Sequence, residues 1–213
     1  MKAVLATRNQ HKVAELRRIL ASAHLELELV GTDEFPDLPD VPETGSTFAA
    51  NALLKAHDVA RRTGCIAIAD DSGLCVDALN GMPGILSARW AGSHGDDVAN
   101  LTLLLNQLAD VPPQRRGAAF HCAAAVATPE GDERVVEGVL TGSLTDAPRG
   151  ENGFGYDPIF VPTGYVLTTA ELTPQEKDAI SHRGQAFRAL VPVLRDLCAE
   201  GGTRTRTPEG TRT

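Results

Sequence analysis

Aromatic residues are scarce in this sequence: Phe, Trp and Tyr together make up 4% of its 213 residues. Its core must therefore be built mainly from Ala, Leu and Val. The sequence also contains no apolar stretch long enough to cross a bilayer and no recognisable signal peptide. We therefore expect a cytoplasmic protein with no membrane partner.

The four cysteines and six histidines show none of the spacings that indicate a metal site or a disulfide framework. No CxxC pair occurs, and neither does HxH or HExxH, so we expect neither a zinc site nor structural disulfides. Most of the cysteines lie within apolar runs, which predicts small buried side chains in a reducing compartment. They are Cys65, Cys75, Cys122 and Cys198.

Positive charge is in short supply, since the net charge is -8. Residues 201–213 carry three arginines against Glu209, a balance of +2, which leaves -10 on residues 1–200. Binding to a nucleic-acid polymer needs a basic surface, so we expect no such partner. A small anion can still be held by a local cluster of cations or by a metal ion.

The apolar pattern that is present predicts an α/β protein. Strands are expected over 2–6, 25–30 and 65–69, and a β-hairpin over 117–128 and 133–143. Helices are expected over 12–21, 47–62, 97–109 and 173–200, the last broken near 181–184. A mixed sheet flanked by helices accounts for this order. Residues 1–200 are predicted to form one domain, and 201–213, which lack apolar residues, a disordered tail.

Two adjacent aspartates follow the predicted strand over 65–69. Asp70 and Asp71 should start in opposite directions because side chains alternate along a strand, and a turn at Gly73 could re-aim one of them. Carboxylate and hydroxyl oxygens are ligands that suit Mg²⁺. An ordinary turn that ends a strand explains these residues equally well.

The segment from Thr7 to Lys12 places polar groups between the first strand and the first helix. The start of a helix offers free N–H groups and a positive dipole end, which can hold a phosphate with help from Lys12. The segment is not a glycine-rich phosphate loop. Taken alone, it is better explained by Thr7 or Asn9 capping the helix, with Lys12 in solvent.

Other polar residues have an ordinary explanation when taken singly. Glu43 is explained by an exposed position in a loop, and Lys55 by a solvated position on a helix. Phe154 and Tyr156 could stack on a base beside Asp157, or could anchor their loop to the core. Three further residues lie near the predicted helix break: Lys177, His182 and Arg183.

Together, six motifs in this order closely resemble the inosine/xanthosine triphosphate pyrophosphatase family. The resemblance covers residues 2–197. The motifs are TxNxxK at 7–12, ETG at 43–45 with Asn51 and Lys55, ADDSGL at 69–74, PGxxSARWAG at 83–92, FGYDPIF at 154–160 and SHRGQA at 181–186. Arg8 and His11 depart from the family pattern, which often has glycine at both positions.

The resemblance implies a role for each motif. The triphosphate would be held by Thr7, Arg8, Asn9, Gln10, His11, Lys12 and Lys55. Glu43 and Asp71 would bind Mg²⁺, with Asp71 as the proton acceptor. The rest of the substrate would lie against Ser72, Phe154, Gly155, Tyr156, Asp157, Lys177, His182 and Arg183. It also implies an elongated mixed sheet between two lobes with a cleft, and a homodimer.

The implied reaction is hydrolysis of noncanonical purine nucleoside triphosphates (ITP, dITP and XTP) to the monophosphate and pyrophosphate. Our hypothesis is that water activated by Asp71 attacks the α-phosphorus beside Mg²⁺, with Asp70 the weaker candidate for the same role. Two alternatives stay open. One is a pyrophosphatase for other modified nucleotides, and the other is a nucleotide-binding protein without catalytic activity.

Overall fold

The structure, a computed structural model, describes residues 2–204, apart from the side chains of His11 and of residues 200–204. Six strands form one mixed sheet: β1 (Lys2–Leu5), β2 (Glu28–Gly31), β3 (Ile66–Val76), β4 (Gly117–Ala127), β5 (Glu133–Leu144) and β6 (Phe160–Pro162). Their order is β2-β1-β3-β4-β5-β6. β1 is parallel to β2 and β3, and the other neighbours are antiparallel. The predicted fold class and hairpin are confirmed.

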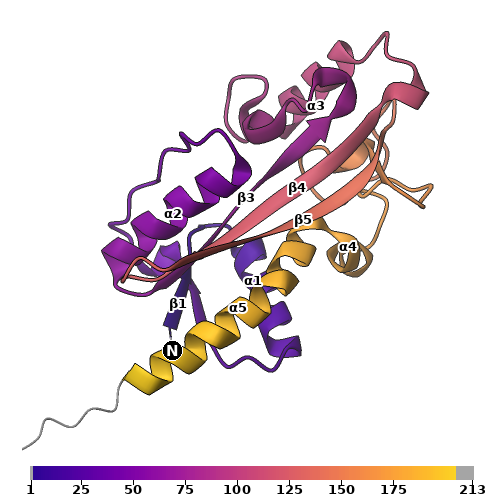
Figure 1. Ribbon diagram of the computed structural model, residues 1–213. Coiled ribbons are helices and arrows are strands. Elements are labelled where there is room, and N and C mark those ends of the chain that lie inside the picture. Colours follow the sequence, from indigo (N-terminus) through magenta and orange to yellow (C-terminus); the bar gives the residue numbers. More distant parts are fainter. Residues whose placement is uncertain (1, 205–213) are drawn as a thin grey trace, which may run out of the picture.

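Five α-helices flank the sheet (Figure 1). They are α1 (Gln10–Ser22), α2 (Phe48–Thr63), α3 (Asp97–Gln107), α4 (Pro174–Ile180) and α5 (His182–Arg204). Short 3₁₀ helices cover Thr32–Glu34, Asp77–Leu79, Gly84–Arg89, Pro113–Arg115 and Asp157–Ile159. None of the helices between residues 2 and 204 is both long and apolar enough to cross a membrane.

Local sequence signals set where these helices begin and end. The Thr47 side chain accepts a hydrogen bond from the Ala50 N–H at the start of α2, and Gly64, with a φ of 65°, ends that helix. The predicted capping box of Thr173 and Glu176 opens α4. The predicted break falls between α4 and α5, at Ser181.

The two faces of the sheet are covered by different helices. Residues of α1 and α5 pack on one face, against Leu5 and Ile68, and α2 packs on the other, against Val4 and Ala67. The apolar residues alternate between the two faces because strand side chains do. A third cluster, around Phe160, lies toward α3 and includes the far part of β3. The molecule is elongated along β3, β4 and β5 (Figure 1), and its description as two lobes stays a prediction.

The prediction that the chain turns at Gly73 is wrong. β3 continues to Val76 because Leu74 and Val76 are buried in the third cluster and the strand pairs with β4 throughout. Gly73 instead allows a close approach. A Cβ there would lie 2.3 Å from the carbonyl oxygen of Gly84 and 2.5 Å from Oγ of Ser87.

Two other element limits also differ from the sequence prediction. The strand expected over 25–30 is β2, which covers only Glu28–Gly31. α5 continues to Arg204, past the predicted domain end at residue 200. The remainder of the predicted tail, 205–213, lies outside the described residues, so the tail stays a prediction.

The topology creates an open position beside β3. The connections β1–α1–β2 and β2–α2–β3 cover opposite faces, so the chain switches faces between β1 and β3. Open α/β sheets bind ligands at such switch points, outside the carboxyl ends of the strands. β1 stops at Leu5, opposite Ile68. Within residues 2–204 no strand pairs with this edge of β3 near the aspartates, and beyond them an isolated bridge joins Cys75 to Pro83.

Candidate active site

Asp70 and Asp71 project from β3 to opposite faces of the sheet, as predicted from strand alternation. Asp70 contacts Lys12 of α1 and Arg183 of α5, whereas Asp71 contacts Asn51 of α2. Polar groups therefore gather on both sides of the open edge of β3.

On the side of α1 and α5, Asp70 is the centre of a charge network. Its Oδ1 and Oδ2 lie 3.0 and 2.8 Å from Nζ of Lys12, and Oδ2 accepts a hydrogen bond from Nε of Arg183 at 3.1 Å. Nη2 of Arg183 donates to Oγ of Ser72 at 3.1 Å. Burial alone would raise the pKa of Asp70, but the charges of Lys12 and Arg183 outweigh it and hold that pKa well below its usual range.

On the side of α2, Lys55 lies between two carboxylates. Its Nζ is 2.6 Å from Oε1 of Glu43 and 3.9 Å from Oδ1 of Asp71. Nδ2 of Asn51 donates to Oδ2 of Asp71 at 2.9 Å, and Nη1 of Arg89 lies 3.3 Å from Oε2 of Glu43. The predicted proximity of Glu43 and Asp71 is therefore present in the fold.

The pKa values of Glu43 and Asp71 are shifted in opposite directions. Burial is the largest influence on Glu43 and raises its pKa, but Lys55 and Arg89 together outweigh it, so the pKa lies below its ordinary value. Burial also dominates at Asp71, and there it keeps the pKa above its ordinary value, with a further contribution from the charge of Glu43. Relative to its own ordinary pKa, Asp71 is therefore a better proton acceptor, whereas Glu43 is a poorer one.

The turn that follows β1 caps α1 and also directs Lys12 into the site. Oγ1 of Thr7 accepts from the N–H of Asn9 at 3.1 Å, and Oδ1 of Asn9 accepts from the N–H of Lys12 at 3.4 Å. The interpretation that places Lys12 in solvent is wrong, because its side chain is only 22% exposed and is paired with Asp70. Arg8 does not join Lys12 at Asp70. Its Nη2 instead donates to the carbonyl of Leu38 at 3.0 Å.

The other two residues of this turn, Gln10 and His11, have no described contact with the charged groups of the site. Gln10 is exposed at the first residue of α1. The side chain of His11 lies outside the described part of the structure.

The loop that holds Phe154 reaches the same side of the sheet as Arg183. Nζ of Lys177 lies 4.8 Å from the centroid of the Phe154 ring, and the guanidinium of Arg183 lies 5.9 Å from it. Asp157 pairs with Lys177 and accepts a hydrogen bond from the N–H of Phe154 at 2.8 Å. Phe154 is exposed, so its ring can meet a planar ligand.

Two other residues of this loop are fixed by the fold. Tyr156 anchors the loop to the core, since it is buried and its hydroxyl donates to the carbonyl of Ser87 at 2.9 Å. Gly155, with a φ of 60°, donates its N–H to Oδ2 of Asp97 at 2.8 Å. The anchoring interpretation is correct for Tyr156, and stacking of a base on Phe154 stays a prediction.

His182 is partly buried, and its Nδ1 atom is shielded from solvent. Its ring stacks on Phe120, with 4.9 Å between the centroids and 9° between the planes. Burial lowers the pKa of His182 well below its ordinary value, and the charge of Arg183 lowers it further. Within the described residues, Nδ1 of His182 has no hydrogen-bond partner.

The stability of the fold is expected to fall as the pH drops below about 6.5, because His182 stays neutral when folded. The unfolded chain takes up a proton at His182 near the ordinary pKa, so acid favours unfolding. The added slope is at most about 1.4 kcal/mol per pH unit, until the folded-state pKa is reached. Free energies of unfolding measured between about pH 8 and pH 5 should show this additional pH dependence in the wild type and not in His182→Phe. Equal slopes in the two proteins would contradict this origin.

With this geometry in place, comparison with known proteins identifies the family. The model of the Ham1 family matches residues 3–193, which is most of the chain. The chain belongs to the Ham1 family. The motifs that carried the resemblance to triphosphate pyrophosphatases all lie within the matched range.

Ham1-family relatives share both sequence and fold with the chain. A protein of Streptomyces coelicolor named dITP/XTP pyrophosphatase is 66% identical over 91% of this chain and 97% of its own length. The crystal structure of a nucleoside-triphosphatase / dITP/XTP pyrophosphatase from Mycobacterium abscessus is 59% identical, with a TM-score of 0.77, over 92% of this chain and 100% of that one. A HAM1 protein from Coxiella burnetii is 43% identical, with a TM-score of 0.85, over 92% and 99% of the two chains.

The Ham1 fold brings most of the predicted site residues together and leaves a few apart. Two groups flank β3, and the loop with Phe154 touches one of them. The first group is Lys12, Asp70, Ser72 and Arg183, and the second is Glu43, Lys55 and Asp71. Arg8 points toward Leu38, and Gln10 is exposed. The arrangement can neutralise a polyanion from both faces of the sheet.

Two residues of this Ham1 site had no role in our sequence prediction. Asn51 is fully buried, accepts from the N–H of Gly45 at 2.8 Å and donates to Asp71. A polar residue one helical turn before Lys55, on the otherwise apolar face of its helix, was the signal that could have revealed it. Arg89 contacts Glu43 across 46 positions of sequence, and although it lies within the motif at 83–92, that motif gave it no role.

Proposed function

We propose that the chain hydrolyses noncanonical purine nucleoside triphosphates, namely ITP, dITP and XTP, to the monophosphate and pyrophosphate. In this role it would remove damaged nucleotides from the cytoplasmic pool. The single observation that carries the proposal is the convergence of Glu43 and Asp71 on Lys55 at the open edge of β3, across from Lys12. The printed names of the relatives support the same reaction and substrates.

Mg²⁺ is the cofactor that we propose. The donors are chemically suitable, because Glu43 and Asp71 offer hard carboxylate oxygens that both approach one cation, the ammonium of Lys55. Residues 2–204 contain no group of three or more His, Cys, Asp or Glu placed to hold a metal by themselves. Mg²⁺ usually takes few protein carboxylates together with substrate phosphates. When bound, the ion would neutralise charge that develops on the phosphates.

The protein's own residues would bind and orient the triphosphate. Lys12 and Lys55 lie on the two sides of β3, so a polyphosphate at the open edge meets a cation from each side. Fixed positive charges lower the barrier because the negative charge of the transition state increases at the leaving pyrophosphate. Asp71, with its raised pKa, would accept the proton of the water that attacks the α-phosphorus.

A panel of nucleoside triphosphates, assayed with and without Mg²⁺, tests this function. We expect release of pyrophosphate from ITP, dITP and XTP, and none in the presence of a chelator. Release of orthophosphate instead would contradict attack at the α-phosphorus. Preference for a modified pyrimidine or a methylated nucleotide would favour the other pyrophosphatase class. Binding of ITP without any hydrolysis would favour a nucleotide-binding protein without catalytic activity.

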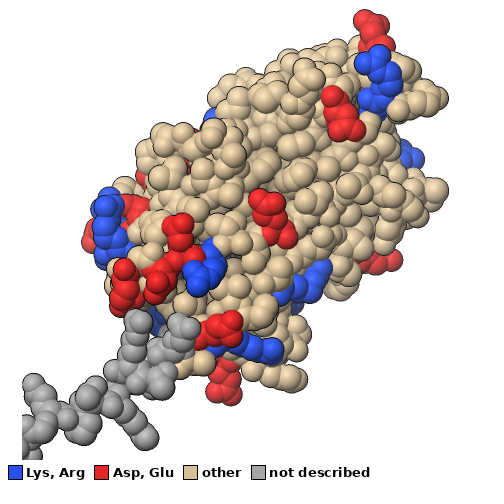
Figure 2. Space-filling view, in the orientation of Figure 1, with Lys and Arg blue, Asp and Glu red and all other residues tan. Residues whose placement is uncertain are grey.

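We also propose that the protein is a homodimer. Gly138 faces α5, where a Cβ would lie 2.1 Å from the carbonyl oxygen of His182, so the odd-numbered residues of β5 face away from that helix. Of these, Val139 is 38% exposed, and its neighbours Thr141 and Ser143 are exposed as well. Figure 2 shows a face on which charged side chains are sparse and gather mainly toward the ends, although an acidic side chain lies near its middle. Such a surface can meet its own copy without the repulsion that a net charge of -8 would otherwise cause.

Size-exclusion chromatography coupled to light scattering should give a molar mass twice that of one chain for the wild type. Val139→Asp should give the mass of one chain, because it places a like charge on both sides of a two-fold contact. The exposed substitution Val98→Asp, on α3, is the matched control and should leave the dimer intact. A monomeric wild type would contradict the proposal.

A further inference from the structure

Asp70 joins cations that come from opposite ends of the chain. Lys12 belongs to α1 and Arg183 to α5, and both lie within 3.1 Å of the Asp70 carboxylate. Asp70 is 4% exposed, and each of its two oxygens has a partner. No other carboxylate of the described residues forms an ion pair with either Lys12 or Arg183.

The position of Asp70 separates it from the proposed metal and base chemistry. It projects to the face of α1 and α5, whereas Glu43, Lys55 and Asp71 gather on the face of α2. Its oxygens are already engaged by two cations, so it is a poor proton acceptor. The idea that Asp70 could act as the base in place of Asp71 thus loses its physical basis.

Lys12 and Arg183 need a fixed anion to stay where they are. Both side chains are mostly buried, and two like charges drawn to one place repel each other unless an opposite charge lies between them. Arg183 is held further by Ser72 and lies against the ring of Phe154. Lys12 follows the turn at the open edge of β3. The Asp70 carboxylate thus links Lys12, beside the open edge of β3, to Arg183, which lies against Phe154.

We infer that Asp70 is a positioning residue, which pre-organises Lys12 and Arg183 to receive a polyphosphate and its nucleoside. This inference rests on the proposed function and assigns Asp70 a role other than that of proton acceptor or metal ligand. Pre-organisation matters because a cation that must first be ordered by the substrate contributes less to binding and to the transition state.

The sign of the effect on anion binding separates positioning from simple electrostatics. If Asp70 acted only through its charge, Asp70→Asn would remove a repelling anion and tighten the binding of a phosphate compound. If Asp70 positions the cations, the same variant weakens binding because Lys12 and Arg183 are released. A role in folding alone would change the melting temperature and leave the affinity of the folded protein unchanged.

The experiment measures binding of inorganic pyrophosphate by calorimetry, without added metal, together with KM and kcat for ITP. The proteins are the wild type, Asp70→Asn, Lys12→Met and the double variant. We expect Asp70→Asn to weaken pyrophosphate binding about tenfold and to raise KM similarly, with a smaller change in kcat. In the Lys12→Met background, Asp70→Asn should weaken pyrophosphate binding less than it does in the wild-type background, since one of the two cations through which Asp70 acts is absent.

Asp71→Asn is the matched control, because it removes the neighbouring carboxylate from the opposite face. It should lower kcat and should not weaken pyrophosphate binding. If Asp70→Asn does not fold, Asp70→Glu replaces it and should also weaken binding, since a longer side chain cannot keep both cations within 3.1 Å. Pyrophosphate binding equal to or tighter than that of the wild type, in whichever variant folds, overturns the inference. A wild type that binds pyrophosphate but hydrolyses no triphosphate overturns the proposed function, while the binding data still decide the role of Asp70.

Discussion

Asp71→Asn is expected to reduce kcat for ITP by about 10³-fold. Asn has nearly the same shape as Asp but cannot accept a proton at neutral pH, and it supplies no anionic oxygen to a metal ion. A positioned general base contributes on the order of 10² to 10⁴ to a rate. Asp71 combines a raised pKa with a place beside Glu43 and Lys55, so both of its proposed tasks are lost together. Steady-state kinetics with pyrophosphate detection measure the effect.

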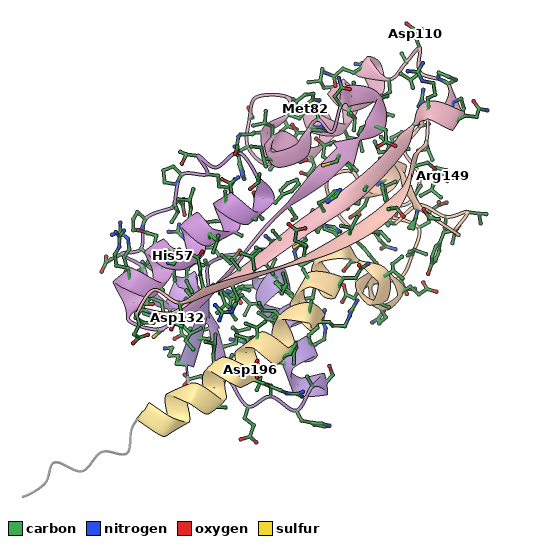
Figure 3. All side chains as sticks on the ribbon, in the orientation of Figure 1. His57, Met82, Asp110, Asp132, Arg149 and Asp196 are labelled. Atoms are coloured by element: carbon green, nitrogen blue, oxygen red, sulfur yellow. The ribbon has the colours of Figure 1, made fainter. Side chains whose placement is uncertain are left out.

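The loss should come from chemistry and not from unfolding. The side-chain oxygen of an asparagine at position 71 can still accept from Nδ2 of Asn51, so the melting temperature should change little. Asp110→Asn is the matched control, since Asp110 is exposed and lies at the far end of the molecule (Figure 3). That control should keep full activity. Undiminished turnover by folded Asp71→Asn would remove Asp71 from the mechanism.

ITP and XTP are expected to exceed ATP in kcat/KM by about 10² to 10⁴. The purine of ITP carries a carbonyl at position 6, where ATP carries an amino group. Arg183 can only donate hydrogen bonds, and it lies beside Phe154, on whose exposed ring the base would stack. A 6-amino group placed there would face a donor and leave it unpaired, which costs far more than a lost apolar contact.

GTP provides the matched comparison for this selectivity. It shares the 6-carbonyl with ITP and differs from it by an amino group at position 2, so the ratio of ITP to GTP measures recognition at position 2 alone. The ratio of ITP to ATP then reports on position 6. Similar kcat/KM values for ITP and ATP would contradict a role in removing noncanonical purines, although pyrophosphate release could persist.

The sequence predicted the order and type of the main elements because their signals are local. The helix over 47–62 has an apolar stripe, an N-terminal Thr47 and a C-terminal Gly64, and α2 begins and ends within one residue of that prediction. The hairpin over 117–143 and the break before α5 were equally clear. The motifs also predicted that Glu43 and Asp71 lie close together, through the resemblance to a known family.

The errors arose where the decisive contacts are distant in sequence. Asp-Asp-Ser-Gly resembles a turn, yet Leu74 and Val76 are buried against residues of α3 and β6, and this keeps the strand extended past Gly73. Strand β2 is shorter than its apolar alternation suggests. Local propensity is a weak guide wherever burial against distant elements opposes it.

By itself, the sequence determined the α/β class, the ends of α2, the start of α4 and the set of charged residues, since these depend on periodicity, capping and composition. Tertiary structure alone decided the partners of those charges. Whether Asp70 or Asp71 faces Lys12 depends on which face α1 and α5 cover, and the chain settles this only when it packs its apolar stripes. The alternation of β3 then directs one aspartate to each face, so neighbouring residues of the same type acquire different surroundings and opposite pKa shifts.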